Sequence, residues 1–192
     1  MKHFDHNAHH HRFLLDQVPA GARTALDVGC GRGGFAGELA ARGLAVTAVD
    51  KHVEASVPGV AFKRGDVLVD DVGGPYDFVS CVAALHHLPL RPALERFRSL
   101  VRPGGVLAVL GLAREESAWD WAVALASTPL DFAVRLVRDD PRSDAPVADW
   151  TLSVREIKAE ADAVLPGARF RRHLYWRYSM VWKADGSNSH QA

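Results

Sequence analysis

The chain is poor in cysteine, has no excess of either charge and carries no long apolar run. Its two cysteines, Cys30 and Cys81, fall in a glycine-rich turn and at the end of an apolar stretch, where small buried thiols are favoured over metal or nucleophile roles. Lys plus Arg equals Asp plus Glu at 23 each, so the basic excess expected of a nucleic-acid binder is absent. A small-molecule partner is therefore favoured over nucleic acid.

The sequence also lacks targeting, membrane and metal signals. Residues 1–20 have no apolar core of signal-peptide length, and no run approaches the roughly 20 apolar residues of a membrane span. The ten histidines, including His9–His11, follow no metal-ligand spacing. These absences predict a cytoplasmic protein with no membrane partner and no bound metal, and they leave its oligomeric state open.

What is present is an alternation of apolar strands and amphipathic helices. Short valine-rich runs predict strands over residues 25–29, 45–49, 60–64, 76–82 and 106–112. Residues 33–42 and 91–101 space apolar side chains at three- and four-residue steps, which is typical of helices. The alternation predicts a doubly wound α/β fold that binds its ligand at the carboxyl ends of the strands, where the strand order reverses.

The C-terminal part of the chain predicts further helices and a pair of final strands. Residues 115–137 show helical periodicity interrupted at Pro129, and Ser153–Glu156 is a capping-box pattern that opens another helix. Residues 168–183 alternate between an apolar and a polar set, which indicates two strands at the sheet edge, one of them antiparallel. We expect a single domain over residues 1–184 and a disordered polar tail over 185–192.

The most informative stretch is Asp27-Val28-Gly29-Cys30-Gly31-Arg32-Gly33-Gly34, an apolar strand that carries a carboxylate and breaks into glycines. Such a turn allows positive φ and lets a ligand approach main-chain N–H groups. Its glycines also satisfy the dinucleotide fingerprint, with Asp50 about twenty residues further on. However, a carboxylate at Asp27 would repel a pyrophosphate and attract a positively charged ligand, so a nicotinamide oxidoreductase is disfavoured.

The same stretch resembles the first motif of class I S-adenosylmethionine-dependent methyltransferases, and the rest of the chain agrees with that family in order. Further segments resemble its second strand with a ribose-binding acid, its adenine-contacting turn, its fourth strand with a following Leu-His-His-Leu, and the turn before its fifth strand. In that order they are Val46–Asp50, Gly65–Val67, Tyr76–Cys81 with Leu85–Leu88, and Arg102–Gly105. The resemblance covers residues 25–112.

The resemblance implies S-adenosyl-L-methionine as the cofactor, S-adenosyl-L-homocysteine as its product and a small-molecule acceptor. It also implies a mostly parallel, Rossmann-like seven-stranded sheet with an antiparallel final strand. The cofactor-binding residues that it implies are Asp27, Gly29, Gly31, Gly33, Asp50, Asp66 and Val67. Asp50 would bind the ribose diol with both carboxylate oxygens, Asp66 would lie near the adenine amine, and Val67 would contact the purine.

His86 and His87 follow the fourth predicted strand, where the acceptor should meet the methyl group. Imidazole titrates near neutrality, so either residue is a candidate base if the acceptor must lose a proton, and a structural imidazole is the alternative. Since the chain must turn directly after His87, we expect His86 to be the catalytic residue and His87 the structural one. Residues 7–15 predict a helix over the cofactor mouth, whose histidines either contact the cofactor or are merely exposed.

Two rival functions stay open. An RNA or nucleobase methyltransferase would share the fold, but no Asn/Asp-Pro-Pro-aromatic motif follows residues 76–82, and neither cysteine lies in a Pro-Cys or Thr-Cys motif. A non-catalytic S-adenosylmethionine-binding partner subunit would keep the cofactor motifs without turnover. Conversion of the cofactor with a panel of acceptors separates the enzyme from the binding subunit.

Overall fold

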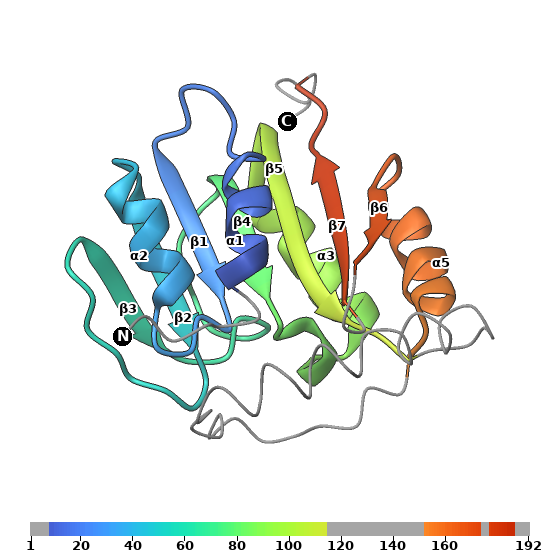
Figure 1. Cartoon of the computed structure of the whole chain (residues 1–192), viewed down its shortest axis with the longest axis horizontal. Helices are drawn as coiled ribbons and strands as arrows, with labels where there is room; N and C mark the ends of the chain where they lie inside the picture. The colour runs from blue at the N-terminus through green and yellow to red at the C-terminus, as the bar shows by residue number, and fades with distance from the viewer. Residues whose placement is uncertain (1–7, 115–151, 174–176, 187–192) are drawn as a thin grey trace, which may run out of the picture.

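The computed structural model describes residues 8–114, 152–173 and 177–186, which form a seven-stranded sheet flanked by helices (Figure 1). The strands are β1 (Thr24–Val28), β2 (Ala45–Asp50), β3 (Val60–Arg64), β4 (Tyr76–Val82), β5 (Val101–Leu112), β6 (Arg169–Arg172) and β7 (Arg177–Lys183). The helices are α1 (Ala8–Leu15), α2 (Gly34–Ala41), α3 (Leu90–Leu100) and α5 (Val154–Val164), with a short 3₁₀ helix η1 (Leu85–His87).

The strand order is β3-β2-β1-β4-β5-β7-β6. Strands β1 to β5 pair in parallel, whereas β7 runs antiparallel to both β5 and β6. The chain therefore starts at the centre, moves outward through β2 and β3, and returns to β4 on the other side of β1. This order confirms the predicted doubly wound sheet with an antiparallel final strand, and it places the reversal point between the carboxyl ends of β1 and β4.

Helices cover both faces of the sheet because alternate strand residues point to opposite sides. On one face, Leu14 of α1 and Phe35 and Leu39 of α2 pack against strand residues that include Ala25 and Phe78. Figure 1 shows α1 lying in front of the centre of the sheet and α2 beside β1, in front of β2. The N-terminal helix is thus part of the core rather than an addition to its surface.

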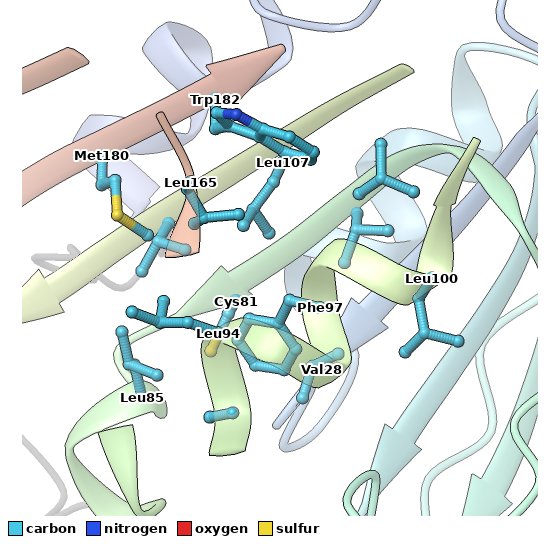
Figure 2. Packing of buried hydrophobic residues seen from close by; sticks show 14 of the residues in the cluster. Val28, Cys81, Leu85, Leu94, Phe97, Leu100, Leu107, Leu165, Met180 and Trp182 are labelled. Carbon is cyan, nitrogen blue, oxygen red and sulfur yellow. The ribbon is translucent and has the colours of Figure 1, made fainter. Parts of the chain in front are cut away.

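The second face is covered by α3 and α5. Figure 2 shows Leu94 and Phe97 of α3 turned toward Val28 of β1 and Cys81 of β4, and all four are almost fully buried in one cluster. Val28 and Cys81 are register partners in the β1–β4 pair. Cys81 is a small buried thiol, as the sequence predicted. This layer holds the β1–β4 pair rigidly from behind.

The amino ends of β1 and β4 are fastened by one carboxylate. Asp77 Oδ2 accepts hydrogen bonds from the backbone N–H groups of Arg23 and Thr24 at 2.8 and 2.9 Å and from the Thr24 hydroxyl at 3.0 Å. Arg102 of β5 donates to Oδ1 at 2.8 Å. Burial acts to raise the pKa of Asp77, but these donors outweigh it and the pKa is lowered. The ionised carboxylate fixes the register between the two strands.

Several boundaries follow the sequence closely, and two features differ from it. The capping box at Ser153 and Glu156 is present, and no helix separates β2 from β3. Strand β5 begins at Val101 rather than at residue 106. The expected polar face of the last strand is wrong for β7, where Ser179 and Val181 are buried together with their apolar neighbours, because β7 lies inside the sheet and β6 forms the edge.

Some expectations concern segments that the structure does not describe. The helical pieces over residues 115–137 lie outside the described residues, as do residues 187–192 of the predicted tail. The single-domain boundary at residue 184 stays a prediction. Within the described ranges, no helix is both long and apolar enough to cross a membrane.

Gly111 supplies a stability test of the β5–β7 pair, because a Cβ there would overlap the ring of Tyr178, which is 1% exposed. We expect Gly111→Ala to lower the free energy of unfolding by about 1–3 kcal/mol, the usual cost of overpacking a core, as measured by urea denaturation. Gly34→Ala is the matched control, since a Cβ at that helical position meets nothing within 4 Å. An equal effect of the two substitutions would contradict the predicted packing.

Candidate functional site

The residues singled out in the sequence gather at the carboxyl edge of the parallel strands. Val28 at the end of β1 lies between Val49 of β2 and Cys81 of β4 in the sheet register. The glycine turn, Asp50 and η1 therefore emerge side by side, at the lower edge of the sheet in Figure 1, where the arrowheads of β1 and β5 point. Strand β3 adds the turn after Arg64 beyond β2.

The glycine turn is shaped by three residues in the left-handed region. Gly29, Gly31 and Gly33 have φ values of 64°, 52° and 79°, which side chains rarely tolerate. A Cβ at Gly29 would overlap Ala84 Cβ, and one at Gly33 would run into the ring of Phe62. At Gly31, by contrast, a Cβ would meet nothing within 4 Å. The turn is closely fitted at both ends and open at its middle, which is where a ligand can approach the backbone.

Asp50 ties this turn to the end of β2. Its Oδ2 accepts a hydrogen bond from the backbone N–H of Gly31 at 2.9 Å. Its Oδ1 accepts from the backbone N–H groups of His52 and Val53, each at 2.9 Å. A carboxylate offers about four lone-pair sites, so these three hydrogen bonds leave one site, on Oδ2, for a further donor. Asp50 is thus oriented by its own backbone neighbours before any ligand arrives.

Asp27 is an interior residue rather than an open strand end. It is 1% exposed, and its Oδ1 accepts a hydrogen bond from the Ser80 hydroxyl at 2.7 Å. Burial raises the pKa of Asp27 to about 7, and Asp50 adds to the rise, whereas Ser80 and the backbone N–H of Ala36 oppose it. The carboxyl group therefore changes its charge near neutral pH.

Asp66 and Val67, in the turn after β3, differ in exposure. Asp66 accepts hydrogen bonds from the backbone N–H of Leu68 at 2.9 Å and from Lys51 Nζ at 3.1 Å, and these two donors lower the pKa of the half-buried carboxyl. Val67 is 4% exposed in the core, and its carbonyl oxygen accepts from Arg96 Nε at 3.0 Å. The turn thus presents an ionised acceptor, while Val67 offers little free surface.

The chain turns sharply after β4. Ala83 has a φ of 53°, and within the described residues it is the non-glycine residue with a positive φ. Its backbone N–H donates to Leu110 of β5 at 2.7 Å, which holds the strained position in place. The turn brings Ala84 against Gly29, so the loops after β1 and β4 touch.

His86 and His87 follow this turn with ring centroids 4.0 Å apart. His86 is half-buried, and burial, assisted by the charge of His87, lowers its pKa to about 4. His87 is exposed. The structure therefore buries His86 more than His87, and the catalytic role expected of His86 and the structural role expected of His87 stay predictions.

Helix α1 lies against α2 through a partly buried contact that the sequence did not reveal. His11 is 6% exposed, lies 2.7 Å from Glu38 of α2 through Nδ1, and meets the edge of the Phe35 ring. The alternative that these histidines are merely exposed is thus wrong for His11. The hydroxyl of Ser80 was also missed, because nothing in a local pattern indicates which β1 residue will face it.

The chemistry available at this edge is binding by oxygen acceptors, since the N–H groups of Gly29, Cys30, Gly31 and Gly33 already donate within the protein. Among the described residues, no three His, Cys, Asp or Glu side chains are grouped so that they could hold a metal ion. The burial of both thiols raises the pKa of Cys30 and of Cys81 to about 12, so each is a neutral thiol at physiological pH. The arrangement suits a polar organic ligand with donors for Asp50 and Asp66.

Comparison with known proteins identifies relatives over most of the chain. The family profile described as "Methyltransferase domain" matches residues 4–151. An uncharacterized methyltransferase of Mycobacterium tuberculosis is 33% identical over 194 aligned positions, which cover 93% of this chain and 95% of that protein. A ubiquinone biosynthesis O-methyltransferase of Xanthomonas axonopodis pv. citri is 35% identical over 132 positions, which cover 62% of this chain and 53% of that protein.

Solved structures share the fold at low sequence identity. The magnesium protoporphyrin IX methyltransferase of Synechocystis PCC 6803, determined with bound SAH, aligns with a TM-score of 0.60 and 17% identity. The alignment covers 93% of this chain and 81% of that one. A likeness at this identity supports the arrangement of strands and helices, and says nothing about the acceptor.

The buried carboxyl of Asp27 makes a testable contribution to stability. Its pKa rises from 3.8 to about 7 on folding, so the folded state binds more protons in this range and stability falls as pH rises from 4 to 7. At about 1.4 kcal/mol per unit the loss amounts to roughly 4 kcal/mol. We expect Asp27→Asn to remove this slope in urea denaturation measured across the range.

Asp77→Asn provides a control of opposite sign. Its carboxyl has a lowered pKa, so its stabilisation is present above the unfolded value and is lost as the pH falls through the folded one. The stability deficit of Asp77→Asn should therefore shrink in acid. If the free energy of unfolding of Asp27→Asn and that of the unsubstituted protein changed in parallel between pH 4 and 7, the Asp27 carboxyl would not titrate in this range.

Proposed function

Since the chain belongs to the methyltransferase-domain family of S-adenosylmethionine-dependent enzymes, we propose that it transfers the methyl group of S-adenosyl-L-methionine to a small-molecule acceptor. The observation that carries this proposal is the glycine turn, which is open at Gly31 and tied to the carboxylate of Asp50. The sulfonium of the bound cofactor supplies an activated methyl group. The protein must then bind the cofactor and the acceptor, align the two and exclude water.

The described residues fit such a cofactor. Asp50 keeps a free lone pair on Oδ2 for a ribose hydroxyl, while its backbone contacts hold it in place. Asp66 is ionised and suits an exocyclic amine such as that of adenine. The absence of a Cβ at Gly31 lets the main chain of the turn approach the methionine part. Val67 would contribute through its backbone position, because its side chain is already in the core.

A small-molecule acceptor is favoured over nucleic acid by charge and by relatives. Basic and acidic residues balance at 23 each, so the molecule has no net positive charge to attract a polyanion. The Xanthomonas relative is named for O-methylation in ubiquinone biosynthesis, and its similarity reaches 62% of this chain. Both points support a small organic acceptor, and neither selects oxygen, nitrogen, sulfur or carbon as the methylated atom.

The ligand preference is the direct test of the proposal. We expect isothermal titration calorimetry to show binding of S-adenosylhomocysteine and no binding of NAD. Asp50→Asn keeps one carboxyl oxygen but loses the charge, and should weaken cofactor binding about tenfold or more, since a hydrogen bond to a charged group contributes about 1.5–3 kcal/mol. Asp71→Asn, an exposed change outside the site, is the control. Tight NAD binding without a response to S-adenosylhomocysteine would refute the proposed function.

His86 and His87 are the candidates for proton removal from a hydroxyl or thiol acceptor. His86 is neutral at pH 7 because its pKa is about 4, so it can accept a hydrogen bond but is a weak base. His87 is exposed beside it. We expect replacement of the residue that acts as base by Gln to lower the single-turnover rate by roughly 10²–10⁴ with such an acceptor. Losses below tenfold for both His86→Gln and His87→Gln would leave them a structural role only.

A further inference from the structure

We propose that Ser80 is a positioning residue of the cofactor site, whose hydroxyl favours the ionised form of the buried Asp27 carboxyl and thereby makes the site prefer the positively charged methyl donor over its uncharged-sulfur product. This inference rests on the proposed function, because it concerns the same cofactor. It goes beyond that function by assigning a role to a strand residue and by predicting how the preference changes with pH.

The geometry joins the two side chains inside the sheet. Asp27 and Ser80 are register partners in the parallel β1–β4 pair. Ser80 is fully buried and Asp27 is 1% exposed, so bulk water does not replace their contact. Ser80 Oγ lies 2.7 Å from Asp27 Oδ1 and 3.2 Å from the carbonyl oxygen of Leu26. A hydroxyl has one proton to donate, and the shorter contact is the one to the carboxyl.

Among the described residues, no cation acts on the pKa of the Asp27 carboxyl. The groups that act on the pKa of its carboxyl, within the described part of the chain, are the donors Ser80 and Ala36 N–H and the carboxylate of Asp50. The neighbouring thiols of Cys30 and Cys81 are neutral, since burial and the charge of Asp27 raise the pKa of each to about 12. A buried carboxylate held by dipoles alone favours any ligand that brings a positive charge.

The methyl donor and its product differ in that charge. The donor carries a sulfonium, whereas the product carries a neutral thioether, and the amino acid part is otherwise the same. An ionised Asp27 attracts the donor more strongly than the product, and a protonated Asp27 does not distinguish them by charge. Because burial raises the pKa of Asp27 to about 7, the preference for the donor should increase as pH rises through neutrality.

Loss of the Ser80 hydroxyl should move the pH at which the preference for the donor changes. Without its hydrogen bond the ionised form loses a donor, and the carboxyl stays protonated to higher pH. A hydrogen bond to a charged group corresponds to a shift of about one pH unit. Donor binding near pH 7 should therefore weaken by up to about fivefold in Ser80→Ala, because the ionised fraction of Asp27 falls from about a half to about a tenth, while product binding changes little.

The experiment measures the dissociation constants of S-adenosylmethionine and S-adenosylhomocysteine by calorimetry between pH 5.5 and 8.5, without an acceptor. In the unsubstituted protein, we expect the donor-to-product preference to increase with pH, and donor binding near pH 7 to release protons, as seen by comparing buffers of different ionisation enthalpy. Ser80→Ala should move the midpoint upward by about one unit, and Ser80→Thr, which retains a hydroxyl, should restore it. Asp27→Asn should abolish the part of the pH dependence that comes from Asp27.

Titration of the ligands' own amino groups is the same for every variant, so the comparison between variants isolates Asp27. A preference in the unsubstituted protein that has the same pH dependence as in Asp27→Asn would overturn the inference, even if Ser80→Ala failed to fold. An unchanged midpoint in a folded Ser80→Ala protein would also overturn it, as would equal weakening of donor and product at every pH. If neither ligand bound the unsubstituted protein, the proposed function would fail first.

Discussion

The site depends on the parallel pairing of β1 with β4 at the point where the strand order reverses. Asp77 locks the amino ends of these strands by accepting from the backbone of Arg23 and Thr24, and α3 supports the carboxyl ends from behind with Leu94 and Phe97. A one-residue slip would turn every side chain of β1 to the other face. The register therefore decides which residue meets Asp27 and where the glycine turn emerges.

The pairing of β1 with β4 determines where the loops of the site lie. The turn after β1 fits against Ala84 from the turn after β4, and Asp50 at the end of β2 holds Gly31 by a hydrogen bond. The strained Ala83 is held by β5. The glycines allow the shape of the first loop, and contacts with neighbouring strands and loops hold each loop in place, which is the preorganisation that alignment of a methyl group with an acceptor requires.

At the centre of the site, the burial of the Asp27 carboxyl opposes its ionisation. Keeping Asp27 in the core costs stability as it ionises, and the hydroxyl of Ser80 offsets part of that cost. Such an arrangement is disfavoured by folding alone, so it fits a group retained for binding. Burial also opposes the charged form of His86, because it lowers the pKa of the imidazole to about 4. Its use as a base would require an acidic acceptor.

The sequence by itself determined the alternation of elements, the glycine turn with Asp27 and Asp50, and the family, since apolar periodicity and glycine spacing are local properties. The tertiary structure alone decided that Asp27 is buried opposite Ser80, that His11 pairs with Glu38, and that β7 lies inside the sheet. The relative burial of His86 and His87 was also decided there. These features depend on register and on contacts between residues far apart in the chain, and no local pattern specifies which distant side chain removes a group from water.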